Sequence, residues 1–480
     1  MQHTDLYFVF GTAIFIILSS IAFNVAGGFT RPSGSYIFFN AVLTFIVGAV
    51  YKTWLGEPGE SNLLNSHTTM MAYDVGMAGM LVAAYLSRRF AAKKGWLEDT
   101  LNQGNTQQAV YGCIAVAVMI TVLPQVFSID ASNGTVFSAL NQINRFMPMA
   151  ILLGTVHQIR KSGGRSSISW AVAFGMIWEF TLGGILSFSK EGLIAPPVTW
   201  LLAAGSQRFR LSLYQVGAIL LGGFLMVHYM IPYAQVGRNY RDQFTSLEQQ
   251  FSITGDLLTH LGSIRDEYNS TEQDVYENQD VTFYHYYNNP QGLMDRLQML
   301  AMDDALIDET EQGEPYGYYP VLFSVEAIVP HVFWPGKPVL NFGNIYAHEI
   351  GLLKADDTTT GISFSPSGES WHLGRWVGLT LLAPAIWFIL FIVFDSVGGD
   401  ARRSPWALLP IAIFAHTGPE GGISGLLYTL TYGIFGMLVV AFGCVYVLPH
   451  LGMLMTGPNR RAKLATGPSL RPIVQSPGAR

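Results

Sequence analysis

Isolated basic side chains, which could bind phosphate, occur beside apolar segments of this chain. Guanidinium and ammonium groups form strong charge-assisted hydrogen bonds with phosphate oxygens. As a set, these residues predict a site for a lipid diphosphate, although snorkelling or contact with anionic lipids explains each one alone somewhat better. The candidate substrate-binding residues are Arg145, Lys190, Arg238, Arg241, Lys337, His331 and His416.

A second group of candidate residues could move a proton. The segment Ser365 to Gly378 reads SPSGESWHLGRWVG and contains Glu369, His372 and Arg375, three residues apart. If the segment is helical, these side chains lie along one stripe. Sugar transfer to a hydroxyl needs a proton acceptor, and a partly desolvated Glu or His suits that role. We therefore take Glu369, His372 and Arg375 as candidate catalytic residues, with a cluster that caps the re-entering helix as the alternative.

The composition indicates that these residues are positioned by a membrane protein. Half of the residues are apolar, 12% are charged, and the mean hydropathy is +0.31. These values predict an all-α polytopic integral membrane protein with about 11 transmembrane helices. The expected spans are Leu6 to Gly28, Tyr36 to Tyr51, Thr69 to Leu86, Ala109 to Leu123, Val136 to Val156, Ile168 to Phe188, Leu193 to Ala204, Leu211 to Pro232, Trp376 to Val397, Pro405 to Ala415 and Ile423 to Met455.

Charge divides the chain further. The stretch from Tyr233 to Arg375 holds 21 of the 33 carboxylates but only 7 of the 27 Lys and Arg residues. The expected organisation is a transmembrane bundle over residues 1–232, an acidic loop domain over 233–375, the last three spans over 376–456, and a disordered basic tail over 457–480.

The basic residues of the short connections predict an orientation. Every second connection is basic, and cytoplasmic loops retain Lys and Arg. The pattern places the C-terminus in the cytoplasm and both the N-terminus and the acidic loop domain outside it. The basic connections contain Arg31, then Arg88 and Arg89, then Arg160 and Lys161, then Arg208 and Arg210, then Arg402 and Arg403.

Three short motifs resemble a known family. They are IVPHVFWPGKPVLNFGNIYAHEIG from Ile328, TGISFSPSGESWHLGRWVG ending at Gly378, and SFSKEG from Ser187 to Gly192. Together they resemble the bacterial Wzy-type O-antigen and exopolysaccharide polymerases. Lys190 stands where that family usually has Arg, and His372 and Leu373 stand where an Asn-Phe pair is common.

The resemblance implies an activity in the bacterial inner membrane. Such enzymes transfer a growing glycan from its polyprenyl diphosphate to another lipid-linked repeat unit, at the outer face and without a metal or other cofactor. Implied partners are polyprenyl-diphosphate-linked oligosaccharides, membrane lipids, a chain-length regulator and a flippase, with no nucleic acid. Two alternatives to the polymerase function are an O-antigen ligase and a transporter of polysaccharide or lipid-linked sugars.

Overall fold

The computed structural model describes residues 3–101, 103–127, 135–240, 247–277, 284–329, 333–334, 336–358 and 360–456. These residues form helices and no β-strand, as the sequence predicts. Seven helices are long and apolar enough to cross a membrane, so the chain is a helical membrane protein. They are Leu6–Thr30, Pro32–Leu55, Ser66–Phe90, Asn105–Pro124, Leu213–Arg238, Pro366–Gly398 and Gly422–Leu454.

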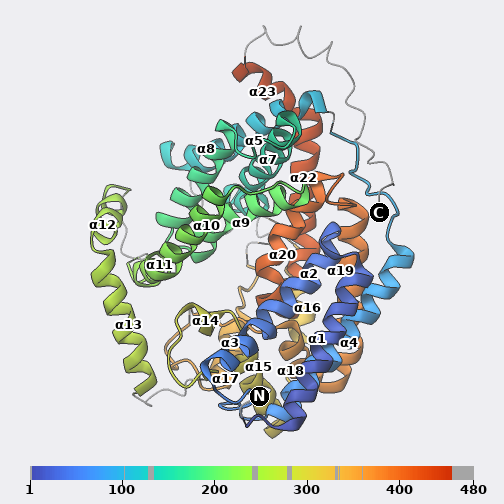
Figure 1. Cartoon of the computed structure of the whole chain (residues 1–480), viewed down its shortest axis with the longest axis vertical. Coiled ribbons are helices and arrows are strands. Elements are labelled where there is room, and N and C mark those ends of the chain that lie inside the picture. Colours follow the sequence, from blue (N-terminus) through green and yellow to red (C-terminus); the bar gives the residue numbers. More distant parts are fainter. Residues whose placement is uncertain are drawn as a thin grey trace.

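The helices follow one another along the chain, with the longest connections before α14, α17 and α18 (Figure 1). The first half contains α1 Leu6–Ala26, α2 Pro32–Ala41, α3 Val47–Leu55, α4 Ser66–Phe90, α5 Gln103–Val126, α6 Val136–Ile143, α7 Phe146–Ser162, α8 Trp170–Trp178, α9 Lys190–Ser206, α10 Leu213–Leu225 and α11 Ile231–Arg238. The second half contains α12 Leu247–Thr259, α13 Leu261–Glu277, α14 Leu293–Arg296, α15 Leu300–Gln312, α16 Tyr319–Glu326, α17 Phe342–Glu349, α18 Pro366–Val377, α19 Ala383–Gly398, α20 Leu408–Glu420, α21 Gly422–Tyr428, α22 Ile434–Phe442 and α23 Leu448–Thr456.

Short 3₁₀ and π segments connect or continue several of these helices. They are η1 Gly28–Thr30, η2 Val42–Ile46, η3 Glu179–Ile185, η4 Met226–Met230, η6 Gly378–Leu382, η7 Pro405–Ala407, η8 Thr429–Gly433 and η9 Gly443–Val447.

Basic connections meet at one end of the bundle, which we call the basic end. Arg88 Nη1 donates to the carbonyl of Val25 at 2.8 Å. Arg160 Nη2 donates to the carbonyl of Arg402 at 3.2 Å, and its Nε donates to Gln207 at 2.9 Å. Connections that are far apart in the sequence therefore share one end of the molecule.

The N-terminal end of α1 and part of the acidic stretch 233–375 lie at the opposite end. The Asp5 amide donates to Glu60 at 2.9 Å, and the Tyr286 hydroxyl donates to the carbonyl of Gly59 at 2.8 Å. Figure 1 shows the N-terminus at the same end of the molecule as α15 and α18. The segment around Tyr286 thus packs directly on the connection between α3 and α4.

Two adjacent carboxylates of α15 join the acidic domain to the bundle. Asp303 accepts hydrogen bonds from the Tyr73 hydroxyl at 2.6 Å and from the Ser365 amide at 2.9 Å. Asp304 accepts from the Thr69 hydroxyl at 2.6 Å and from amides just before α4. Burial raises the pKa of each carboxyl to about 6. The helix α15 therefore fixes the N-terminal ends of α18 and α4.

Removing one of these carboxylates should destabilise the fold. We expect Asp304→Ala to lower the free energy of unfolding by about 2–4 kcal/mol, because the buried Thr69 hydroxyl and the amides of Leu64 and Asn65 just before α4 lose their acceptor. Thermal unfolding of the purified protein measures this change. The control is Glu309→Ala, at an exposed position of the same helix. Equal midpoints for the two variants would contradict the assigned role of Asp304.

Helix boundaries in the acidic domain differ from the sequence pattern. Asn289 as a helix cap, Pro290 in the first turn and an apolar face with Leu293 and Leu300 predict one helix from Asn289 to Asp308, but α14 and α15 are separate. The break occurs because the Met299 amide donates to the carbonyl of Thr44 at 3.0 Å, while Gln298 Oε1 accepts from the amide of Ala301 at 3.1 Å. A contact with the bundle therefore replaces the helical hydrogen bond.

Two further segments expected to be continuous are also interrupted. The stretch from Phe244 to Tyr268 forms α12 and α13 over its described residues, which begin at Leu247. The expected span from Val136 to Val156 is broken between α6 and α7, where Arg145 precedes the first residue of α7. Arg145 thus lies at a helix end and not within a helix.

Candidate functional site

Three short neighbouring helices have charged side chains at one end. The helices α7, α9 and α20 pack on one another. They contain 17, 17 and 13 residues. At about 1.5 Å per residue, each is shorter than the roughly 30 Å of hydrocarbon in a bilayer. Their far ends, away from the basic end, carry Arg145, Lys190 and Glu420.

The turn before α9 is fixed by close backbone packing. Ser189 accepts a hydrogen bond from the Gly192 amide at 3.1 Å and caps α9. A Cβ atom at Gly192 would lie 1.8 Å from the carbonyl oxygen of Gly183, so only glycine fits there. The small residues of the SFSKEG motif therefore press α9 against η3 and set the position of Lys190.

Lys190 is the most unusual cation of this group. Its ammonium nitrogen is buried and makes no hydrogen bond within the part of the chain that the structure describes. Burial, together with the positive charges of Arg296 and Arg238, lowers the pKa of Lys190 to about 7. Glu272 and Glu420 act in the opposite direction. An anion placed here would stabilise the charged ammonium.

Arg238 and Arg296 bring positive charge to Lys190 from two other elements. Arg238 is the last residue of α11, and its Nε donates to the carbonyl of Phe188 at 3.4 Å. Arg296 is the last residue of α14 in the acidic domain. Both side chains belong to exposed residues. Three cations from distant parts of the sequence thus act electrostatically on one another at the N-terminal end of α9, and Arg296 also interacts with Tyr268 of α13.

His416 lies between two carboxylates beside these cations. Its Nε2 atom is 3.8 Å from Glu191 Oε2, and its Nδ1 atom is 3.7 Å from Glu420 Oε2. The Ser363 hydroxyl donates to Glu420 Oε2 at 3.4 Å. The exposed fractions are 49% for His416, 65% for Glu191 and 35% for Glu420. The imidazole is therefore open to a ligand.

Arg145 extends the charged region toward η3. Arg145 interacts electrostatically with Glu179 and with Tyr428. Glu179 also interacts with Glu191. We call the whole set the helix-end cluster. It consists of Arg145, Glu179, Lys190, Glu191, Arg238, Arg296, His416 and Glu420.

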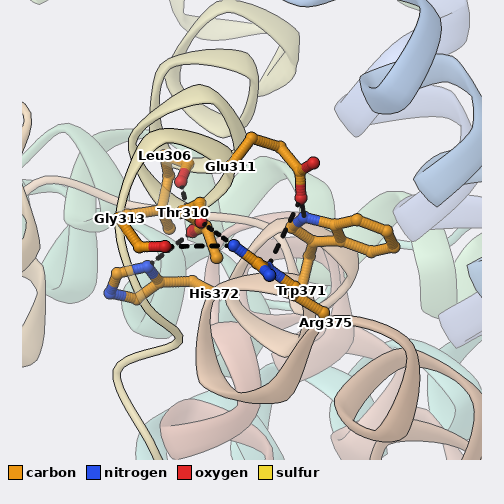
Figure 2. Close-up of polar contacts among 7 residues, drawn as sticks. All are labelled: Leu306, Thr310, Glu311, Gly313, Trp371, His372 and Arg375. Atoms are coloured by element: carbon orange, nitrogen blue, oxygen red, sulfur yellow. Dashed lines mark hydrogen bonds and ion pairs between the residues drawn. The ribbon is translucent and has the colours of Figure 1, made fainter.

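Arg375 lies in a different environment. The backbone leaves the helical conformation at Gly374, and Arg375 has φ of 45°, so Arg375 does not continue the stripe of Glu369 and His372. Its Nη2 donates to the carbonyls of Thr310 at 2.7 Å and Gly313 at 3.1 Å (Figure 2). These bonds satisfy carbonyls at the C-terminal end of α15.

His372 supports the same end of α15. The Thr310 hydroxyl donates to the carbonyl of Leu306 at 2.6 Å and lies 2.9 Å from His372 Nδ1 (Figure 2). Because the hydroxyl proton is used in the bond to Leu306, His372 Nδ1 carries a proton and donates it to the Thr310 oxygen. His372 Nε2 lies 3.1 Å from Glu349 Oε2 without the alignment of a hydrogen bond. The imidazole is buried, with 3% of its residue surface exposed.

Glu369 is buried and has several hydrogen-bond donors. Its carboxylate accepts from the Ile423 amide, from the Ser424 hydroxyl at 3.2 Å and from the Tyr346 hydroxyl at 3.2 Å. Only 3% of the residue is exposed. The carboxylate therefore connects α18 to the N-terminal end of α21, and its catalytic role stays a prediction.

The remaining sequence candidates lie elsewhere. Lys337 Nζ donates to the carbonyls of Ala327 at 3.0 Å and Val329 at 2.8 Å, just beyond the end of α16. Arg241 and His331 lie outside the described residues. Arg145, Lys190, Arg238 and His416 thus belong to the helix-end cluster, whereas Arg375 and Lys337 donate to backbone carbonyls between residues 310 and 329.

No protein-family model, curated protein or solved structure gives a significant match to this chain. The functional proposal is therefore built on the side chains of the helix-end cluster and on the sequence motifs.

Sequence reasoning did not select Arg296 or Glu191. Arg296 is the one Lys or Arg residue between Arg265 and Lys337. An isolated arginine in an acidic stretch could have marked it as a candidate anion-binding residue. Glu191 follows Lys190 directly in the SFSKEG motif. Chemically, the cluster offers three converging cations for phosphate oxygens and one accessible imidazole for a proton.

Proposed function

We propose that this protein is a bacterial inner-membrane glycosyltransferase that polymerises polyprenyl-diphosphate-linked oligosaccharide repeat units into O-antigen or exopolysaccharide. The convergence of Lys190, Arg238 and Arg296 at the end of a short helix carries the proposal. Burial and two guanidinium groups oppose the charge on the Lys190 ammonium, while Glu272 and Glu420 only partly offset them, so the negative charge of a diphosphate would stabilise the ammonium further. The motif resemblance to Wzy-type polymerases points to the same substrate.

The route of the lipid tail supports this substrate class. Arg238 ends the apolar helix Leu213–Arg238, whose α10 part has no buried residue. A polyprenyl tail has to stay in hydrocarbon while its diphosphate reaches the cations. The exposed helix that carries Arg238 therefore connects the lipid phase with the proposed headgroup site.

The proposed topology has eleven spans. The seven long helices are supplemented by four shorter segments, which are α6 with α7, α8 with η3, the part of α9 from Leu193 to Ala204, and α20. The basic end faces the cytoplasm, because cytoplasmic connections retain Lys and Arg. The acidic domain and the N-terminus then face outward, as a polymerase of flipped repeat units requires.

The reaction in this proposal is a substitution at a sugar carbon. The cations hold the diphosphate of the donor and stabilise its negative charge as it leaves. The acceptor is the non-reducing end of a second lipid-linked unit. A chain-length regulator and a flippase are the proposed protein partners, and the proposal includes no cofactor.

Glycan profiling of a deletion strain tests the function. Loss of a polymerase leaves single repeat units on the cell surface. Loss of a ligase leaves long polymer that is not attached to its acceptor, and loss of a transporter leaves repeat units at the inner face. The proposal predicts the first profile, and either of the other two would contradict it.

The Lys190 ammonium makes a pH dependence testable. Its pKa is lowered to about 7, while Arg238, Arg296, Glu272 and Glu420 surround it. Without a ligand, the Lys190 ammonium therefore loses its positive charge as the pH rises through 7. Diphosphate binding requires the protonated ammonium. The affinity for geranylgeranyl diphosphate should weaken between pH 7 and pH 9, by at most about tenfold per pH unit.

The matched variant is Lys190→Arg, which keeps its charge throughout this range. Isothermal titration should show a flatter pH dependence for Lys190→Arg than for the wild type. The same slope in both proteins would show that another group controls binding.

A further inference from the structure

An accessible proton acceptor lies beside the cations, and it is not one of the residues of the SPSGESWHLGRWVG segment. Glu369 and His372 each have 3% of their surface exposed and already contact several groups. His416 has 49% of its side chain exposed. A general base has to reach the hydroxyl of the acceptor sugar, so accessibility favours His416.

We propose that His416 is the general base that deprotonates the acceptor hydroxyl, with Glu420 as its positioning residue. This inference rests on the proposed function and assigns a catalytic residue within it. The supporting geometry is the placement of the imidazole between Glu420 and Glu191, at 3.7 Å and 3.8 Å.

Glu420 connects the imidazole to the cation site. It lies four residues after His416 on α20, so the two side chains share a helix face. The Ser363 hydroxyl donates to its Oε2 atom, and its charge also acts on Lys190. Glu420 therefore faces His416 on one side and the proposed diphosphate site on the other.

The two carboxylates beside His416 have different surroundings. Glu420 is held by Ser363, whereas Glu191 is 65% exposed. We assign His416 Nδ1 to the contact with Glu420 and His416 Nε2 to the hydroxyl of the acceptor sugar. When the acceptor sugar binds, it takes the place of the exposed Glu191 carboxylate beside Nε2. Negative charge beside the ring stabilises the imidazolium that forms when the proton is accepted.

The step balances in atoms and charge. The acceptor oxygen forms a bond to the anomeric carbon of the donor while the bond from that carbon to the diphosphate oxygen breaks. The diphosphate leaves with the bonding electron pair. The proton of the acceptor hydroxyl moves to His416 Nε2 and is later released to water.

A reconstituted assay separates binding from transfer. Lipid-linked repeat units isolated from the deletion strain serve as substrate, and geranylgeranyl diphosphate serves as the binding probe. We expect His416→Gln and His416→Asn to lower the transfer rate by roughly 10²- to 10⁴-fold. Probe affinity should stay within about twofold of the wild type. Glu420→Gln should lower transfer by about tenfold, mainly in kcat and not in KM.

The matched control is His67→Gln. His67 also pairs with a carboxylate, Asp5 at 2.7 Å, and is 64% exposed, but it lies outside the helix-end cluster. This variant should transfer at the wild-type rate.

The outcomes distinguish the inference from the proposed function. Transfer by folded His416→Gln and His416→Asn within threefold of the wild type would overturn the inference, and so would an equal loss of probe binding and transfer. If Lys190→Ala abolishes transfer in the same assay, the proposed function stands without this base. Normal transfer by both Lys190→Ala and His416→Gln would overturn both.

Discussion

Replacing Lys190 with alanine should reduce polymer formation by roughly 10- to 100-fold while the protein remains in the membrane at a normal level. Hydrogen bonds to charged groups contribute about 1.5–3 kcal/mol each, which corresponds to this range. The ammonium is buried and makes no hydrogen bond among the described residues, so its removal leaves no partner unsatisfied. The effect should therefore fall on activity and not on folding.

The measurement is the length distribution of the surface glycan in a deletion strain that carries each variant. Arg238→Ala and Arg296→Ala should shorten the polymer in the same direction, because both charges act on the same site. The control is Lys354→Ala, an exposed lysine of the acidic domain. Wild-type polymer length with Lys190→Ala at a normal protein level would remove Lys190 from the active site.

Replacing Glu369 with alanine should have the largest effect on stability. The Ile423 amide and the hydroxyls of Ser424 and Tyr346 would lose their buried acceptor. Each buried donor left without an acceptor costs about 1–3 kcal/mol, so the loss is a large share of the stability of a domain. We expect little Glu369→Ala protein in the membrane.

Glu369→Gln separates the structural role from a catalytic one. The amide keeps the shape of the side chain and an acceptor oxygen, so the variant should be folded and should form polymer. Protein level, thermal midpoint and polymer length are measured together, with Glu326→Ala at an exposed position as the control. A stable Glu369→Gln protein without transfer activity would show that Glu369 is the base.

The membrane character and its charge pattern were predictable from local sequence. Long apolar runs have no alternative to helices in a bilayer, and the basic connections with Arg88, Arg160 and Arg402 do meet at one end. Helix breaks in the acidic domain were not predictable. The break before α15 depends on a hydrogen bond from Met299 to Thr44, more than two hundred residues away.

The candidate site was predictable only in part, for a similar reason. Charge and position selected Lys190, Arg238 and His416, because isolated polar residues beside apolar segments stand out. Spacing also suggested a shared stripe for Glu369 and Arg375, but the backbone turns at Gly374. The positions of the short helix ends in the fold decide which cations lie near one another. A local sequence pattern does not predict these positions.

Binding of an isoprenoid diphosphate to the purified protein tests the central claim most directly. Titration of geranylgeranyl diphosphate and of uncharged geranylgeraniol into nanodiscs would compare the wild type with a Lys190→Ala, Arg238→Ala, Arg296→Ala triple variant. We predict that the wild type prefers the diphosphate and that the folded triple variant binds it at least about 100-fold more weakly. Equal diphosphate affinity in the two proteins would contradict a headgroup site at the helix-end cluster.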